Sequence, residues 1–151
     1  MASPVTRPQP LRANLAPAVT KQSQIHALVV SFELEIRKPL LRTLESLKAD
    51  VVVCSRVEQA EEVLGRDPID VVFCDEHLPD GSYVNLLEAN HGHNKIPRLV
   101  VTTRQGDWNL YFEAVAKGAF DVIRCPCQPT DVEMTLIRVL REGDESVGAC
   151  A

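Results

Sequence analysis

The sequence predicts a doubly wound α/β fold, in which a five-stranded parallel sheet is covered by helices on both faces. Two observations support this fold class. Five short segments are apolar throughout instead of alternating with polar residues, which is typical of strands covered on both faces. The stretches between and after them have the periodicity of amphipathic helices. A repeating strand–helix order then requires right-handed crossovers between parallel strands.

The predicted strands are short and rich in β-branched or aromatic residues. In chain order they are Ala27–Val30, Val51–Cys54, Val71–Cys74, Leu99–Val101 and Phe120–Ile123. None of them alternates between apolar and polar residues, which is the pattern of strands covered on both faces in a parallel sheet.

Five helices are predicted from apolar residues at three- and four-residue spacings. Ser55 is expected to be the N-cap of the second helix, and Gly118 to follow the end of the fourth. Pro39 falls inside the first pattern and would remove a helical hydrogen bond, so we expect that helix to start late, near Arg37, rather than to be kinked. The repeating positions, helix by helix, are Ile36, Leu40, Leu44, Leu47; Val57, Ala60, Val63, Leu64; Val84, Leu86, Leu87; Leu110, Ala114, Val115, Ala116; and Val132, Leu136, Val139, Leu140.

The two ends of the chain have the composition of tails. Residues 1–23 contain four of the chain's 10 prolines among small and polar residues, which predicts a disordered segment. Residues 143–151 are polar and contain glycine, and we expect a flexible C-terminal tail there. The folded domain is therefore expected over 24–142. Too few residues follow Leu140 to form an output domain, so we expect either a domain that acts on its own, which is favoured, or a piece of a longer chain.

Composition narrows the possible environments and partners. A formal net charge of −5 and an isoelectric point near 5.4 argue against direct nucleic-acid binding, which needs a basic surface. No apolar run approaches the ~20 residues of a membrane span, and the N-terminus lacks the apolar stretch of a signal peptide. We expect a cytoplasmic protein. The five cysteines are scattered without a disulfide framework, so free thiols are expected.

Polar residues follow the predicted strands at the sheet edge where ligands of open parallel sheets collect. The segments that contain them resemble, in order, the receiver domain of two-component response regulators. The matching segments are Val29–Arg37, Asp70–Gly81, Pro97–Thr103 and Lys117–Pro126. The resemblance covers about residues 26–141. It implies a flavodoxin-like topology with strand order 2-1-3-4-5.

The resemblance also implies a site and its chemistry. Receiver domains accept a phosphoryl group from a phosphohistidine onto an aspartate, assisted by Mg²⁺ and a lysine. Asp75 matches the phosphoacceptor, Thr102 the switch hydroxyl, and the backbone carbonyl of His77 a metal-ligand position. The implied protein is a signalling domain and not an enzyme, beyond accepting phosphate from a histidine kinase.

This sequence departs from the family at the positions that neutralise charge. The two adjacent acidic residues after the first strand are replaced by Ser31 and Phe32, and the lysine is replaced by Cys125. Losing the charge-assisted hydrogen bond of the lysine removes roughly 1.5–3 kcal/mol. Without its oxygen ligands, Mg²⁺ is not expected to bind as a cofactor. We therefore expect a pseudo-receiver with weak or absent phosphorylation of Asp75.

A protein partner is expected on the face formed in this family by the fourth helix, the fifth strand and the fifth helix. Trp108, Tyr111 and Phe112 gather in the fourth predicted helix, and they span more than one buried stripe, so at least one should be exposed. The family's coupling aromatic is replaced by Val122. The partner could be a histidine kinase, an output protein or a second copy of this chain, and neither nucleic acid nor membrane is expected.

Other interpretations remain open. Asp75 could be a working phosphoacceptor with an atypical metal site that uses Glu33, or a carboxylate that only caps the following turn. The Thr102 hydroxyl could be satisfied by nearby backbone. The chain could instead be a small redox or cofactor protein that uses Cys125 and Cys127, although no glycine-rich loop follows the first strand. A zinc site needs about four ligands, so structural roles are favoured for these cysteines.

Overall fold

The computed structural model describes residues 24–89 and 97–150, with side chains described up to Glu142. The predicted N-terminal tail, residues 1–23, lies outside the described residues. No helix in the described part of the chain has the length and apolar character needed to cross a membrane.

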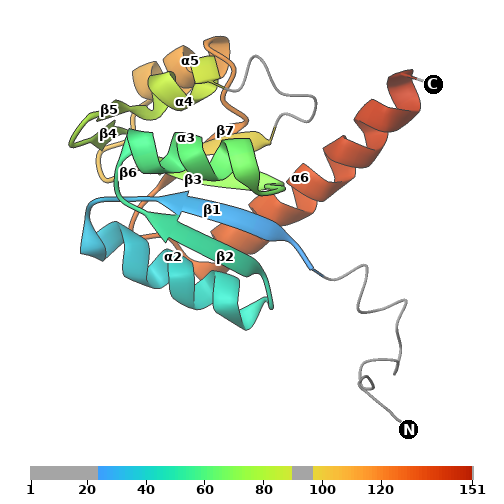
Figure 1. The fold of residues 1–151 in the computed structure, drawn as a ribbon, viewed down its shortest axis with the longest axis horizontal. Coiled ribbons are helices and arrows are strands. Elements are labelled where there is room, and N and C mark those ends of the chain that lie inside the picture. Colours follow the sequence, from blue (N-terminus) through green and yellow to red (C-terminus); the bar gives the residue numbers. More distant parts are fainter. Residues whose placement is uncertain (1–23, 90–96, 151) are drawn as a thin grey trace, which may run out of the picture.

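The five predicted strands form one parallel sheet in the predicted order. The strands are β1 (His26–Val30), β2 (Asp50–Cys54), β3 (Val71–Asp75), β6 (Arg98–Thr103) and β7 (Asp121–Arg124). Their order is β2-β1-β3-β6-β7, and every neighbouring pair is parallel (Figure 1). The last strand lies one residue further along the chain than predicted. Because all strands run the same way, their carboxyl ends meet at one edge of the sheet.

Helices cover both faces of the sheet, as the uninterrupted apolar strands predicted (Figure 1). The apolar cluster on one face includes residues of α3, α4 and α5. The cluster on the other face includes residues of α2 and α6. The helices span Leu34–Ser46 (α2), Val57–Arg66 (α3), Tyr83–Ala89 (α4), Trp108–Ala116 (α5) and Pro129–Cys150 (α6).

The expected late start of the first helix is wrong. Helix α2 begins at Leu34, and Pro39 lies inside it. Ile36 and Leu40 are both buried against the sheet, so packing of this apolar face outweighs the loss of one hydrogen bond. The carbonyl group that loses its helical partner belongs to Glu35, an exposed residue.

The predicted N-cap of α3 is also wrong. Arg56 occupies the N-cap position and makes no side-chain capping bond within the described residues. The Asp80 carboxylate accepts hydrogen bonds from the N–H groups of Val57 at 2.8 Å and Glu58 at 3.1 Å instead. Asp80 lies between the short antiparallel strands β4 (His77–Leu78) and β5 (Gly81–Ser82). A side chain 23 residues away in sequence therefore caps the helix.

The C-terminal ends of helices α5 and α6 can be compared with the positions expected from the sequence. Gly118 follows α5 with a φ of 114°, which confirms it as the residue that ends this helix. Helix α6 continues to Cys150, so the domain boundary expected at Glu142 falls inside a helix. Polarity alone does not predict whether a terminal segment continues a helix or forms a tail.

Candidate functional site

Asp75 ends the central strand β3 and is buried, with 3% of its surface exposed. Its Oδ1 accepts a hydrogen bond from Thr102 Oγ1 at 2.9 Å. Its Oδ2 accepts bonds from Ser31 Oγ at 3.0 Å and from the Phe32 N–H at 3.0 Å, with the Glu33 N–H at 3.5 Å. Both carboxylate oxygens are therefore bonded to donors of the protein itself.

The protein environment shifts the pKa of Asp75 in two opposing directions. Burial disfavours the charged form and raises the pKa, whereas the bonds from Thr102, Phe32 and Ser31 stabilise the charge and lower it. Burial is the larger effect, so the pKa of Asp75 lies above its usual value. The arrangement satisfies the carboxylate without supplying a positive charge.

The sheet register explains why these residues meet. Asp75 is paired with Thr102 on the adjacent strand β6, and the end of β1, just before Ser31, is paired with the end of β3. The Thr102 hydroxyl bonds the carboxylate, so the alternative that nearby backbone satisfies it is wrong. Asp75 accepts backbone N–H groups from the segment after β1, and not from the turn that follows its own strand.

The other predicted site residues of this edge line one pocket of about 590 Å³. Glu33, Asp75, His77 and Thr102 all contribute to its wall. Glu33 forms an ion pair with Arg104 at 3.6 Å, and Arg104 also contacts Glu35 at 3.2 Å. Arg104 is a site residue that the sequence did not predict, although its place just after β6 puts it at this edge of the sheet.

His77 lies in the short strand β4, opposite Ser82. Its imidazole is exposed and lies 3.5 Å from Glu76, so the side chain points to a neighbouring carboxylate at the surface. Only its backbone carbonyl was predicted as a metal ligand.

The residues around Asp75 do not fit Mg²⁺, which needs near-octahedral oxygen ligands. Ser31 supplies a hydroxyl that already donates to Asp75. Phe32 supplies no side-chain oxygen and is 61% exposed, and the Glu33 carboxylate is paired with Arg104. Over residues 24–89 and 97–142, no group of three or more His, Cys, Asp or Glu side chains is arranged to hold a metal ion.

Cys125 follows β7 and is buried, with 3% of its surface exposed. Its N–H donates to the Thr103 carbonyl at 2.7 Å, which fixes it at the same edge as Asp75. A hydrogen bond with Cys127, together with burial, raises the pKa of the Cys125 thiol. The group at this position is therefore uncharged, and the adjacent Arg124 is exposed.

The family assignment follows from the sequence match that spans these elements. Residues 27–137 match the family described as "Response regulator receiver domain". The chain belongs to the receiver-domain family of response regulators. Receiver domains are phosphoacceptors rather than catalytic enzymes, and they typically interact with kinases and output proteins.

Two curated proteins of Pseudomonas aeruginosa are similar to this receiver domain. The response regulator protein PilR is 33% identical over 104 residues, which cover 69% of this chain and 23% of PilR. The alginate biosynthesis transcriptional regulatory protein AlgB is 26% identical over 121 residues, covering 80% of this chain and 27% of AlgB. The receiver domain thus spans about a quarter of the length of these relatives.

Solved structures confirm the receiver fold. The signal receiver domain of a putative Luxo repressor protein from Vibrio parahaemolyticus superposes with a TM-score of 0.74 at 16% identity, covering 83% of this chain and 97% of that one. A putative response regulator from Chloroflexus aurantiacus gives a TM-score of 0.72 at 20% identity, covering 78% and 98%. At these identities the likeness concerns the fold alone.

The three aromatic residues of α5 form a cluster on the receiver's surface. Trp108 lies 6.0 Å from Tyr111 and 5.9 Å from Phe112 between ring centroids. Trp108 is 73% exposed and Phe112 63% exposed, which confirms that at least one of the three faces solvent. The cluster begins at the N-terminus of α5, where the Asp107 carboxylate caps the helix by accepting the N–H of Leu110 at 2.9 Å.

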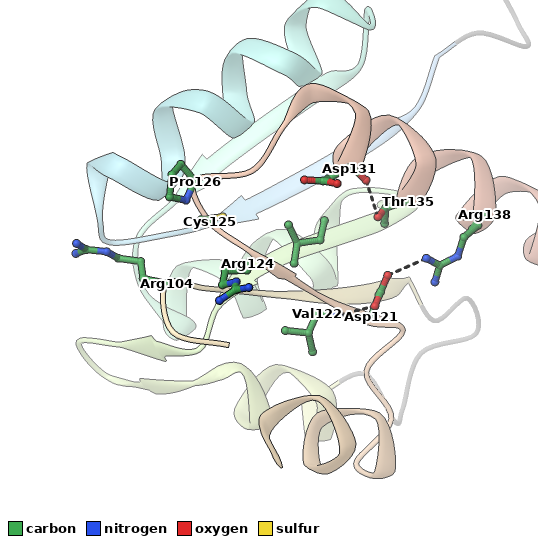
Figure 2. A pocket seen from close by; sticks show the side chains of 10 residues that line it. Arg104, Asp121, Val122, Arg124, Cys125, Pro126, Asp131, Thr135 and Arg138 are labelled. Atoms are coloured by element: carbon green, nitrogen blue, oxygen red, sulfur yellow. Dashed lines mark hydrogen bonds and ion pairs between the residues drawn. The ribbon is translucent and has the colours of Figure 1, made fainter. Parts of the chain in front are cut away.

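A polar groove of about 700 Å³ runs along β7, the edge strand of the receiver sheet (Figure 2). Residues of β7 and α6 line it, together with Arg104. The Asp121 carboxylate accepts the Val122 N–H at 2.8 Å and pairs with Arg138 at 2.8 Å. The carboxylate therefore accepts a hydrogen bond from one backbone N–H group of β7, a strand that has a neighbour on one side only.

Proposed function

We propose that this receiver domain transmits signals by binding other proteins, and that Asp75 accepts little or no phosphate. The observation behind the proposal is the set of hydrogen bonds to Asp75. Both of its oxygens accept bonds from Thr102, Ser31 and the Phe32 backbone. An incoming phosphoryl group would have to displace these donors, and Arg104, which lines the same pocket, is already paired with acidic side chains.

Electrostatics at the site supports the same proposal. Phosphoryl transfer is accelerated by cations placed where negative charge develops. Here the position of the family's lysine is occupied by the buried, neutral thiol of Cys125. The guanidinium of Arg104 is already paired with Glu33 and Glu35. Losing one charge-assisted bond costs about 1.5–3 kcal/mol, or roughly 10- to 150-fold in rate.

The proposed protein-binding surface is the aromatic cluster of α5, defined as Trp108, Tyr111 and Phe112. Exposed large aromatics are over-represented at the centres of protein interfaces, because they bury much apolar area at a low entropic cost. The candidate partners are a histidine kinase, an output protein or a second copy of the domain. Free thiols at the described cysteines suit a reducing compartment, and we place the domain in the cytoplasm.

The test of the phosphorylation proposal is incubation with acetyl phosphate and Mg²⁺, followed by intact-mass analysis. We expect no addition of a phosphoryl mass in the wild type. The variant Ser31→Asp/Phe32→Asp/Cys125→Lys restores the acidic pair and the lysine, and it should gain a phosphoryl group at Asp75. Adding Asp75→Asn to it should abolish that gain. A phosphoryl adduct on wild-type Asp75 would instead establish a working acceptor with an atypical metal site.

A further inference from the structure

Two cysteines flank Pro126 in the segment that joins β7 to α6. Cys125 is buried, whereas Cys127 is half-buried and packs against the apolar cluster that contains Cys125. The neighbours Pro126 and Gln128 are exposed, so Cys127 lies at the surface of the segment. Helix α6 starts two residues later, at Pro129. The fold therefore places one sheltered and one accessible thiol side by side.

The two thiols interact in a way that activates one of them. A hydrogen bond from Cys125 lowers the pKa of the Cys127 thiol to about 7. The same bond raises the pKa of Cys125, which stays protonated and acts as the donor. Cys127 also precedes the N-terminus of a 22-residue helix, whose dipole favours a negative charge nearby.

Cys54 provides an internal comparison. It is half-buried like Cys127, but burial raises its pKa to about 11. Burial also raises the pKa of Cys74, which has no exposed surface. Among the cysteines whose side chains are described, Cys127 is thus the one whose pKa is lowered. Partial exposure alone does not explain the lowered pKa of Cys127, because Cys54 shares that exposure.

We propose that Cys127 and Cys125 form an oxidation site, in which a hydroperoxide converts the two thiols into a disulfide. The Cys127 thiolate attacks one peroxide oxygen and breaks the O–O bond, which gives a sulfenic acid and releases an alcohol or water. The Cys125 sulfur then attacks the sulfenic sulfur. The S–S bond forms, the S–O bond breaks, and the hydroxide leaves with the Cys125 proton as water. The dithiol loses two electrons and two protons, and the hydroperoxide is reduced.

The position of this dithiol connects it to the rest of the receiver. Cys125 is close enough to Asp75 for the carboxylate charge to contribute to its raised pKa. Cys125 also lines the groove along β7, next to Arg124 (Figure 2). A disulfide at this point would change the end of β7 beside the groove, which shares Arg104 with the Asp75 pocket. Oxidation is then an input to the domain that does not depend on the phosphorylation of Asp75.

The first test compares alkylation rates of the full chain with iodoacetamide at pH 7, by peptide mass mapping. The pKa of Cys127 is lowered and that of Cys54 is raised, so Cys127 has the larger thiolate fraction at this pH. The lower intrinsic nucleophilicity of the weaker base offsets part of this advantage, and we expect Cys127 to react at least about tenfold faster than Cys54. Equal rates at the two cysteines would overturn the proposal, and this measurement needs no variant.

The second test treats the full chain with hydrogen peroxide. We expect a loss of two hydrogen masses and a cross-link between Cys125 and Cys127 in the peptide map. Cys125→Ser should stop the reaction at a Cys127 sulfenic acid that dimedone traps, Cys127→Ser should abolish the cross-link, and Cys54→Ser should leave it unchanged. If peroxide leaves this pair reduced, or links other cysteines first, the proposal is wrong. Neither result changes the acetyl phosphate outcome, so the two proposals fail separately.

Discussion

The hydroxyl of Ser31 donates a hydrogen bond to Oδ2 of Asp75 across 3.0 Å, where β1 and β3 end side by side. The two residues are 44 positions apart in sequence. In the family an acidic residue at this position repels the phosphoacceptor carboxylate, and a divalent cation relieves the repulsion. Here the neutral Ser31 hydroxyl donates a hydrogen bond to Asp75, so the contact is attractive without a cation.

Replacing Ser31 with Asp should make the stability of the domain depend on Mg²⁺. The change removes a donor and puts a second carboxylate beside a buried one, so the free energy of unfolding should fall by about 1–3 kcal/mol without metal. Urea unfolding with and without Mg²⁺ measures the effect. The wild type is the control and should show no comparable Mg²⁺ response. A variant that stays insensitive to Mg²⁺ would show that more than this carboxylate is missing.

Replacing Thr102 with Val should destabilise the domain, because Oδ1 of the buried Asp75 loses its hydrogen-bond donor. The expected loss in the free energy of unfolding is about 1–3 kcal/mol. Thr135→Val is the matched control, since Thr135 is equally buried but its hydroxyl bonds the Asp131 carbonyl one helical turn earlier. If both variants lose the same free energy of unfolding in urea, the hydrogen bond to Asp75 stabilises the domain no more than an ordinary bond to a helix carbonyl.

The stability of the domain should carry a pH dependence that originates in Asp75. Burial raises its pKa above the ordinary value of 3.8, so the folded state keeps this proton to a higher pH than the unfolded chain. The stability that protonated Asp75 contributes to the folded state is fully present below the ordinary pKa and is lost as the pH rises through the folded-state pKa. Asp75→Asn should therefore gain stability relative to the wild type from about pH 4 upward. Parallel profiles of the two proteins in urea unfolding would contradict this prediction.

Replacing Trp108 and Phe112 with Ala should weaken binding to a cognate kinase or output protein while leaving the fold intact. Both side chains are mostly exposed, so the free energy of unfolding should change by less than about 1 kcal/mol. Isothermal titration with the cognate partner measures the affinity. Val53→Ala is the control, because Val53 is partly exposed on β2, the opposite edge strand. Unchanged affinity would place the interface elsewhere.

Much of the fold could be predicted because burial of apolar faces is encoded locally. The uninterrupted apolar runs predicted five strands to within two residues at each end, and helical spacing predicted the helices between them. Asp75 and Thr102 could also be placed, because each comes at the end of such a run. The resemblance then assigned both residues to one edge of the sheet.

Sequence alone thus determined which segments form the five strands of the parallel sheet and where the helices between them lie, since the period of apolar residues depends only on near neighbours. Tertiary structure decided which polar groups meet: Ser31 with Asp75, Asp80 with the first turn of α3, and Arg104 with Glu33. These partners come from segments that only the strand order and register bring together. A hydrogen bond depends on positions within a few tenths of an ångström, and no local pattern of residues encodes that information.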